Sequence, residues 1–185
     1  MNIQKYIEEV HQTAVEHGWH EEQKPKEHWL MLIITEICEM IAADRINKRA
    51  NRQMFEHRLV VEPSDPDERF KEWFKTYIKE SFEDELADVC IRTFDFMAEN
   101  GIKAETLNRI HSELHPDFNR QHLLIQSFDL IGVITDCDSA SIVCSSIFAV
   151  AEHWAKLYDI DLEWYIEQKM RYNRLREWKH GNKKY

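Results

Sequence analysis

Two pairs of acidic residues lie in apolar stretches of the chain and could bind a metal ion. In the stretch from Leu30 to Ala43, the only charged residues are Glu36 and Glu39. Residues three positions apart lie on one face of a helix, so both carboxylates point the same way from a helix that is otherwise apolar. Burying two like charges is costly unless a cation meets them. The first pair therefore predicts a cation beside this helix.

The second pair, Glu85 and Asp88, has the same spacing and is followed by the apolar residues Val-Cys-Ile. Arg92 and Asp95 continue the same helical face, which gives a polar stripe along an apolar helix. Two such helices packed side by side would bring four carboxylates together. An all-oxygen ligand set suits a hard cation, and Mg²⁺ is commonly held by a few carboxylates, water and substrate phosphate. The pattern predicts a Mg²⁺ site, with Mn²⁺ as a substitute, formed by Glu36, Glu39, Glu85 and Asp88.

Two alternatives to a Mg²⁺ site remain open. Each acidic pair could bond an Arg or Lys of a neighbouring helix, with Arg92 an obvious partner for Asp88; the apolar surroundings of both pairs favour a metal instead. A di-iron bundle would also use converging carboxylates, but it requires Glu-x-x-His on two helices. Only Glu8 with His11 and Glu177 with His180 have that spacing. The first lies on an amphipathic helix and the second near a helix end, so iron is the second choice of metal.

A group of histidines, His111, His115 and His122, is the other metal-like feature of the sequence. It lacks the HExxH spacing that fixes zinc ligands on a helix, and Pro116 breaks the pattern. We interpret this segment as a solvated loop.

The elements that would position these residues are expected to be helices. The 185 residues include only four Gly and four Pro, which leaves little turn chemistry for a many-stranded sheet. The length suits one domain, so we predict a single all-α domain, 1–185, built as a bundle of about five to seven helices. Apolar periodicity and stop signals predict helices at about 3–17, 27–45, 67–99 with an interruption near Glu80 and Ser81, 121–134, 139–158 and 161–179, with a polar loop over 48–67.

Composition also excludes some classes of function. The formal net charge of −10 argues against a protein that coats nucleic-acid phosphates. No stretch approaches the roughly 18 apolar residues that span a bilayer, and the four cysteines have no CxxC spacing. We expect a cytoplasmic protein that binds neither nucleic acid nor membranes.

The C-terminal residues are basic, in contrast to the rest of the chain. From Lys169 to Tyr185 there are seven Lys and Arg residues and one acid, Glu177. Lys169, Asn173 and Arg176 share one helical face, where they could contact phosphates and sugar. Basic residues also favour a helix C-terminus because of its dipole, so the spacing alone leaves both possibilities open.

The chain resembles the MazG-like family of all-α nucleoside triphosphate pyrophosphohydrolases. The matching motifs are Thr-Glu-Ile-Cys-Glu, Asp-Glu-Leu-Ala-Asp-Val and Lys-Met-Arg-Tyr-Asn-Arg-Leu-Arg, and the likeness covers about residues 2–101 and 161–185. It implies hydrolysis of a nucleoside triphosphate, expected to be a deoxynucleotide, to the monophosphate and pyrophosphate, by a homodimer or larger oligomer.

The resemblance also implies roles for individual residues. Glu36, Glu39, Glu85 and Asp88 would bind Mg²⁺ and form the catalytic centre. Trp19 would stack on the base, although a single aromatic residue after a helix is more often part of the core. The substrate would further contact Arg92, Lys169, Asn173 and Arg176.

One position departs from the family pattern. Many relatives carry a further glutamate immediately before the first acidic pair, where this chain has Thr35. The water-activating group is therefore left open among the four metal-binding carboxylates, Glu83, Asp84 and the metal alone. The same departure favours a third possibility, a non-catalytic module that binds a nucleotide or a protein partner.

Overall fold

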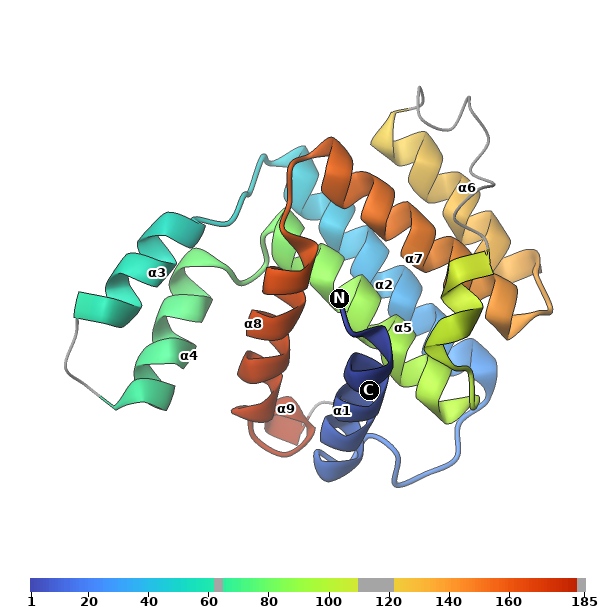
Figure 1. The fold of residues 1–185 in the computed structure, drawn as a ribbon, viewed down its shortest axis with the longest axis horizontal. Helices are drawn as coiled ribbons and strands as arrows, with labels where there is room; N and C mark the ends of the chain where they lie inside the picture. The colour runs from blue at the N-terminus through green and yellow to red at the C-terminus, as the bar shows by residue number, and fades with distance from the viewer. Residues whose placement is uncertain (62–64, 110–121, 183–185) are drawn as a thin grey trace.

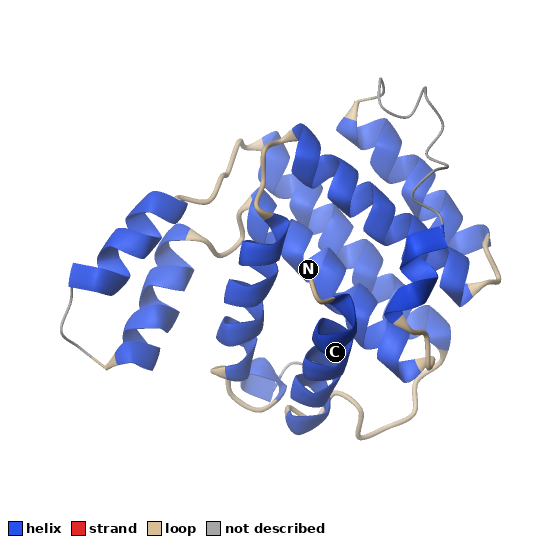
Figure 2. Cartoon of the chain, viewed as in Figure 1, coloured by secondary structure: helices blue, strands red, loops and turns tan. Residues whose placement is uncertain are grey.

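The computed structural model describes residues 1–61, 65–109 and 122–182, and these residues are helical with no strand (Figure 2). No helix within these ranges combines the length and the apolar character needed to cross a bilayer. The helices are α1 (Ile3–Glu16), α2 (Lys26–Arg45), α3 (Arg52–Val61), α4 (Pro66–Tyr77), α5 (Phe82–Glu99), the 3₁₀ turn η1 (Ala104–Arg109), α6 (Leu123–Asp136), α7 (Ala140–Leu157), α8 (Leu162–Arg174) and the short α9 (Lys179–Asn182).

Helix α5 is the central element, in contact with α1, α2, α7 and α8 (Figure 1). Its start is well defined, because the Ser81 side chain accepts a hydrogen bond from the Asp84 backbone N–H and three acids occupy the first turn. The chain leaves the helix at Asn100 and Gly101, and Gly101 has a φ of +64°. Most of the α5 side chains are buried, so its polar residues lie inside the molecule.

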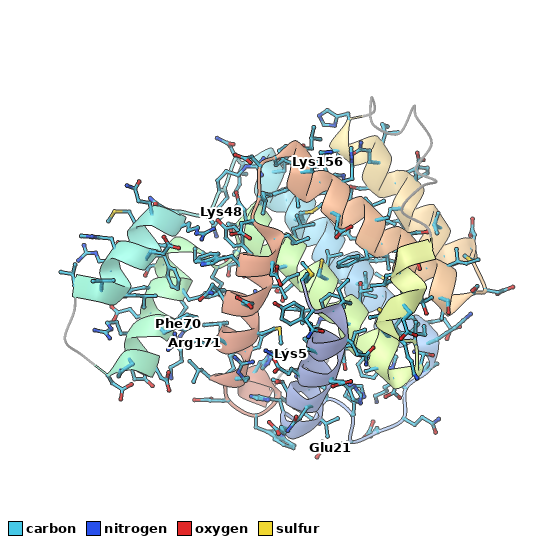
Figure 3. The ribbon with its side chains drawn as sticks, in the orientation of Figure 1. Lys5, Glu21, Lys48, Phe70, Lys156 and Arg171 are labelled. Atoms are coloured by element: carbon cyan, nitrogen blue, oxygen red, sulfur yellow. The ribbon has the colours of Figure 1, made fainter. Side chains whose placement is uncertain are left out.

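Helices α3 and α4 form a pair beside the main body, as Figure 1 shows, and α8 connects them to it. Phe74 of α4 stacks on Tyr172 of α8 with ring centroids 4.5 Å apart. The Arg171 guanidinium lies 4.0 Å from the centre of the Phe70 ring, and both residues are labelled in Figure 3. These contacts place the aromatic face of α4, with Phe70 and Phe74, against α8.

The structure confirms the expected helix over 27–45 and the helix starts at Ser139 and Asp161, whose side chains cap α7 and α8. The interruption expected near Glu80 and Ser81 is also confirmed, because the chain turns at residues 78–81 between α4 and α5, where Glu80 has a φ of +63°. Two expectations were wrong. The polar stretch 48–67 contains α3. The helix expected over 161–179 ends at Arg174, so α9 is separate.

The splitting of these segments also makes the expected number of five to seven helices too low, since α1 to α9 lie within the described ranges. The bundle itself is confirmed as all-helical there. A single domain over 1–185 stays a prediction.

Candidate metal centre

Three carboxylates converge between α2 and α5. Oxygens of Glu36 from α2 and of Glu85 and Asp88 from α5 all lie within 4.8 Å of one another. Glu36 and Glu85 are only 8% and 4% exposed. The two helices bring them together because α2 and α5 pack on each other, and Glu36, Glu85 and Asp88 lie along that contact. This group is the centre that the spacing predicts, apart from Glu39.

Two cations from neighbouring positions contact the same group. Lys169 Nζ of α8 lies 2.8 Å from both oxygens of Asp84 and 2.6 Å from Asp88 Oδ2. Arg92 Nε donates to Glu36 Oε1 at 2.9 Å. Neighbouring basic side chains therefore do pair with the acids, but Arg92 pairs with Glu36 across the helices and not with Asp88 as the spacing suggested.

The cations do not balance the acids. Glu36, Asp84, Glu85 and Asp88 are four potential negative charges, and Lys169 and Arg92 supply two positive ones. Burial, followed by the charge of Asp88, raises the pKa of Glu36 to about 7 and that of Glu85 to about 9. With all four acids ionised, two negative charges would be left over, which is the charge that one divalent cation supplies, and carboxylate oxygens are the ligands that Mg²⁺ prefers. The residues present fit such an ion.

Asp84 is the residue of this centre that sequence reasoning left without a role in binding. It is 1% exposed, and its side chain accepts hydrogen bonds from the Glu80 backbone N–H and from Lys169. Burial alone would lower the pKa of Lys169, but Asp84 and Asp88 raise it above its ordinary value. The sequence shows Asp84 only as a further acid next to Glu85. Its partner, Lys169, becomes apparent only from the packing of α5 against α8.

A cavity of about 70 Å³ adjoins the carboxylates. Its wall includes Asp88, Arg92 and Asp95, which confirms the polar stripe along α5. The predicted substrate-binding residues Trp19, Asn173 and Arg176 also line the cavity. The volume accommodates a few water molecules, so a nucleotide could enter only after side chains move.

Two polar groups at the cavity lack a counterpart among the described residues. Asn173 Oδ1 is buried with no hydrogen-bond donor. The Arg176 guanidinium forms no ion pair within the described ranges, and burial lowers its pKa. A buried acceptor and an unpaired cation favour a ligand that offers a hydrogen-bond donor and an anion.

A larger basic groove of about 620 Å³ continues from the cavity and shares Arg176 and His180 with it. Its lysines come from the link after α2, where Figure 3 labels Lys48, and from the stretch that runs from α4 to the following turn, which supplies Lys71, Lys75 and Lys79. Lys75 is exposed and forms no ion pair within the described ranges, whereas Lys48 and Lys79 both contact Glu80. The groove therefore has a net positive charge.

The segment after α8 is held against α1 by specific contacts that close the cavity. His17 Nε2 lies 3.0 Å from the Arg176 carbonyl oxygen, and the Lys179 N–H donates to the His17 carbonyl oxygen at 3.1 Å. Gly18 has a φ of +80°, and a Cβ built there would lie 2.3 Å from the Trp178 ring. Glycine is needed at this position for both reasons.

Several predicted residues have surroundings that the sequence did not reveal. Glu39 is exposed and lies outside the three-carboxylate group. The Lys169 ammonium already faces three carboxylate oxygens, so contact with a phosphate requires that it exchange one of them. Trp19 packs edge to face on His180 at the cavity wall, with ring centroids 5.3 Å apart.

The residues considered as water-activating groups are similarly occupied. Glu83 Oε2 accepts from the Ala50 backbone N–H at 2.8 Å, and Asp84 is bonded to Lys169. Thr35 is exposed and donates to the Met31 carbonyl oxygen. Within the described ranges, Glu36, Glu85 and Asp88 are therefore the best placed of these candidates to act on a water molecule.

The histidines lie away from this centre. Among the described residues, the carboxylate group contains no histidine, and His11 belongs to a second group with His20 and Asp95. The Glu8 carboxylate accepts a hydrogen bond from the Gln4 side chain, and it is not part of the group that contains His11. His122 caps α6, while His111 and His115 lie outside the described residues.

Comparisons of the chain with protein-family models, with curated proteins and with solved structures each found no match. The likeness to the MazG-like family therefore rests on the motifs alone. Any assignment of function has to be argued from the site.

Proposed function

We propose that the chain is a Mg²⁺-dependent hydrolase that converts a nucleoside triphosphate to the monophosphate and pyrophosphate. The observation that carries the proposal is the charge mismatch at the site. Four acids face only two basic side chains, so the pKa values of Glu36 and Glu85 are raised, and the partly buried Arg176, which forms no ion pair within the described ranges, lies on the wall of the adjoining cavity. A divalent cation with a polyphosphate would satisfy both sides.

The carboxylates would hold the ion. Glu36, Glu85 and Asp88 supply its protein ligands, and Glu39, one turn along α2, would have to turn inward to join them. When bound, Mg²⁺ would neutralise phosphate charge, polarise the phosphorus under attack and make a bound water more acidic. A triphosphate carries about four negative charges at neutral pH, so it would be repelled by the carboxylates without such an ion.

The remaining residues would bind and orient the substrate. Arg176 would pair with a phosphate, and Lys75 and its neighbours in the basic groove would contact the outer phosphates. Asn173 Oδ1 would accept a hydrogen bond from a sugar hydroxyl or a base N–H. Lys169 and Arg92 would keep the carboxylates in position, and Trp19 would flank the base.

The test is a panel of ribo- and deoxynucleoside triphosphates incubated with the purified protein and Mg²⁺ or Mn²⁺. We expect monophosphate and pyrophosphate in equal amounts, with deoxynucleotides preferred. Release of inorganic phosphate alone would contradict the proposal, as would the absence of turnover with every nucleotide. Light scattering on the same sample would test the proposed homodimer or larger assembly.

A non-catalytic nucleotide-binding module is the second candidate. It is favoured by Lys169 and Arg92, which already neutralise part of the acidic group without a metal. This candidate predicts that calorimetry detects nucleotide binding at the cavity while the product assay detects no hydrolysis with either metal. Binding without turnover, lost in Arg176→Gln, would support it over the hydrolase.

A further inference from the structure

A second cluster of metal-ligating side chains lies at the opposite end of α5. It consists of His11 from α1, His20 from the link between α1 and α2, and Asp95 from α5, and one possible ligand atom of each lies within 4.8 Å of the others. His11 Nδ1 lies 2.8 Å from Asp95 Oδ1, and His20 Nε2 lies 2.9 and 3.1 Å from Oδ1 and Oδ2. The side chains of His20 and Asp95 are 9% and 7% exposed. Two imidazoles therefore meet one buried carboxylate.

The hydrogen bonds of His20 require a positive charge at this point. Its Nδ1 lies 3.1 Å from Glu99 Oε2, so both ring nitrogens face carboxylate oxygens. A neutral imidazole has one N–H and one lone pair. If Nδ1–H donates to Glu99, the Nε2 lone pair faces Asp95, and a proton or a metal ion has to lie between them.

The distances are those of hydrogen bonds, and a small opening of the cluster would make room for a metal ion. Zn²⁺ binds imidazole nitrogen and carboxylate oxygen at roughly 2.0–2.2 Å, so ligand atoms around a tetrahedral ion are roughly 3.3 Å apart. The His20 and His11 nitrogens are slightly closer than that to Asp95, and small rotations would open the space. The contact from Glu99 to His20 Nδ1 is the outer-shell arrangement that fixes the tautomer of a metal-bound histidine.

The His20 ring is also held in one orientation. It stacks on Trp29 with ring centroids 4.6 Å apart and an angle of 13° between the planes, and it meets His11 edge to face at 4.5 Å. A ring fixed by packing lowers the entropic cost of binding a metal. Two nitrogens and a carboxylate favour a borderline transition metal, in contrast to the all-oxygen group at the other end of α5.

We propose that His11 Nδ1, His20 Nε2 and Asp95 bind a divalent transition metal of the Zn²⁺ class, with Glu99 orienting His20. Binding would release the proton between His20 and Asp95 to solvent and place the metal in its position. The ion would tie α1 and the following link to α5 beside the cavity. This site does not depend on the proposed hydrolase activity.

The test is titration of chelator-treated protein with Zn²⁺ by calorimetry, in an excess of Mg²⁺ that saturates the carboxylates. We expect one equivalent of Zn²⁺ to bind, and Co²⁺ in its place to give visible absorption bands of a nitrogen- and oxygen-coordinated ion. His11→Gln and His20→Gln should each weaken Zn²⁺ binding by at least about 100-fold, and Glu99→Gln by about 10- to 100-fold.

Two controls distinguish Zn²⁺ binding at this site from binding elsewhere on the protein. His57→Gln, an exposed histidine on α3, should leave Zn²⁺ binding unchanged, and Glu85→Gln should retain it even if hydrolysis is lost. Circular dichroism would show whether each variant is folded, and His11, the more exposed of the two ligands, serves as the variant if His20→Gln does not fold. The proposal is overturned if Zn²⁺ does not bind, if both histidine variants bind it equally well, or if NMR shows His20 doubly protonated with and without Zn²⁺.

Discussion

The two ends of α5 carry buried acidic groups whose pKa values shift in opposite directions. At the N-terminal end, burial and neighbouring acids raise the pKa of Glu85 to about 9. At the C-terminal end, burial alone would raise the pKa of Asp95, but hydrogen bonds from His11 and His20 lower it below its ordinary value. Both side chains are almost fully buried, so burial does not explain the difference.

The neighbouring side chains of the two carboxylates explain the difference between their pKa values. Asp95 is bonded by two imidazoles, whereas Glu85 shares its surroundings with three further acids and only two basic residues. The N-terminal end therefore lacks positive charge, and the C-terminal end has groups that can supply it. This contrast is the reason to expect a hard cation at one end and a nitrogen-bound cation at the other.

The largest expected effect is on hydrolysis at the N-terminal end. Glu85→Gln and Asp88→Asn each remove a charged metal ligand, so Mg²⁺-dependent turnover should fall at least about 100-fold with helical circular dichroism unchanged. Glu39→Gln should cause a comparable loss if the exposed Glu39 turns inward to bind the ion. Glu27 is an exposed glutamate on α2, the helix that carries Glu39, so Glu27→Gln is the matched control and should retain full activity. Full activity in Glu85→Gln would remove the proposed metal role of this group.

A large effect on stability is expected from Lys169. Lys169→Met leaves Asp84 buried without its cation, so the free energy of unfolding should fall by about 3–5 kcal/mol. Adding Asp84→Asn removes the uncompensated charge and should restore most of the loss. Urea denaturation of the two variants measures both changes. Equal instability of the single and double variants would show that the pair matters through packing and not through charge.

The two ends should also differ in their response to pH. Because Glu85 holds its proton in the folded state up to about pH 9, and an unfolded glutamate loses it near pH 4.5, stability should fall as the pH rises between these values. The lowered pKa of Asp95 contributes stability that is lost only on acidification, below pH 4. The melting temperature of metal-free protein should therefore drop by several degrees from pH 6 to pH 9.

Variants isolate the group responsible for that drop. The raised pKa of His20 acts in the same direction, because protonated His20 is favoured in the folded state. Glu85→Gln should flatten the pH dependence by the share due to Glu85, and saturating Mg²⁺ should do the same by stabilising the ionised carboxylates. A drop of equal size in wild type and Glu85→Gln would exclude Glu85 as its source and leave His20 and Glu36, whose pKa values are also raised.

The smallest effect concerns the link that carries His20. Gly18→Ala places a methyl group against Trp178 in a backbone conformation that disfavours alanine, so stability should fall by about 1 kcal/mol. Gly132→Ala in α6 has open space and should stabilise by about 0.5–1 kcal/mol. Thermal melts of both variants test this difference. Zn²⁺ affinity should weaken in the first variant only, because it displaces the link.

Much of the helical content followed from the sequence. The apolar period and the side-chain caps predicted α2, α7 and the start of α8, because both act within a few residues. The division of 67–99 into α4 and α5 was predicted near Glu80 and Ser81, although the positive φ of Glu80 could not be inferred from its residue type. Helix α3 was missed because half of its ten residues are polar and the role of Phe55 becomes clear only from its packing against α4 and α8.

What the sequence determined by itself is that acids lie at helical spacing within apolar helices. From this it predicted that Glu36, Glu39, Glu85 and Asp88 would converge, and all of them except the exposed Glu39 do. Periodicity and the cost of burying charge are local properties, so they can be read from one chain. Only the tertiary structure decided the partners: Lys169 with Asp84, Arg92 with Glu36, and His20 with Asp95. These pairs join residues 56 to 85 positions apart, and their proximity depends on how helices pack and not on any local pattern.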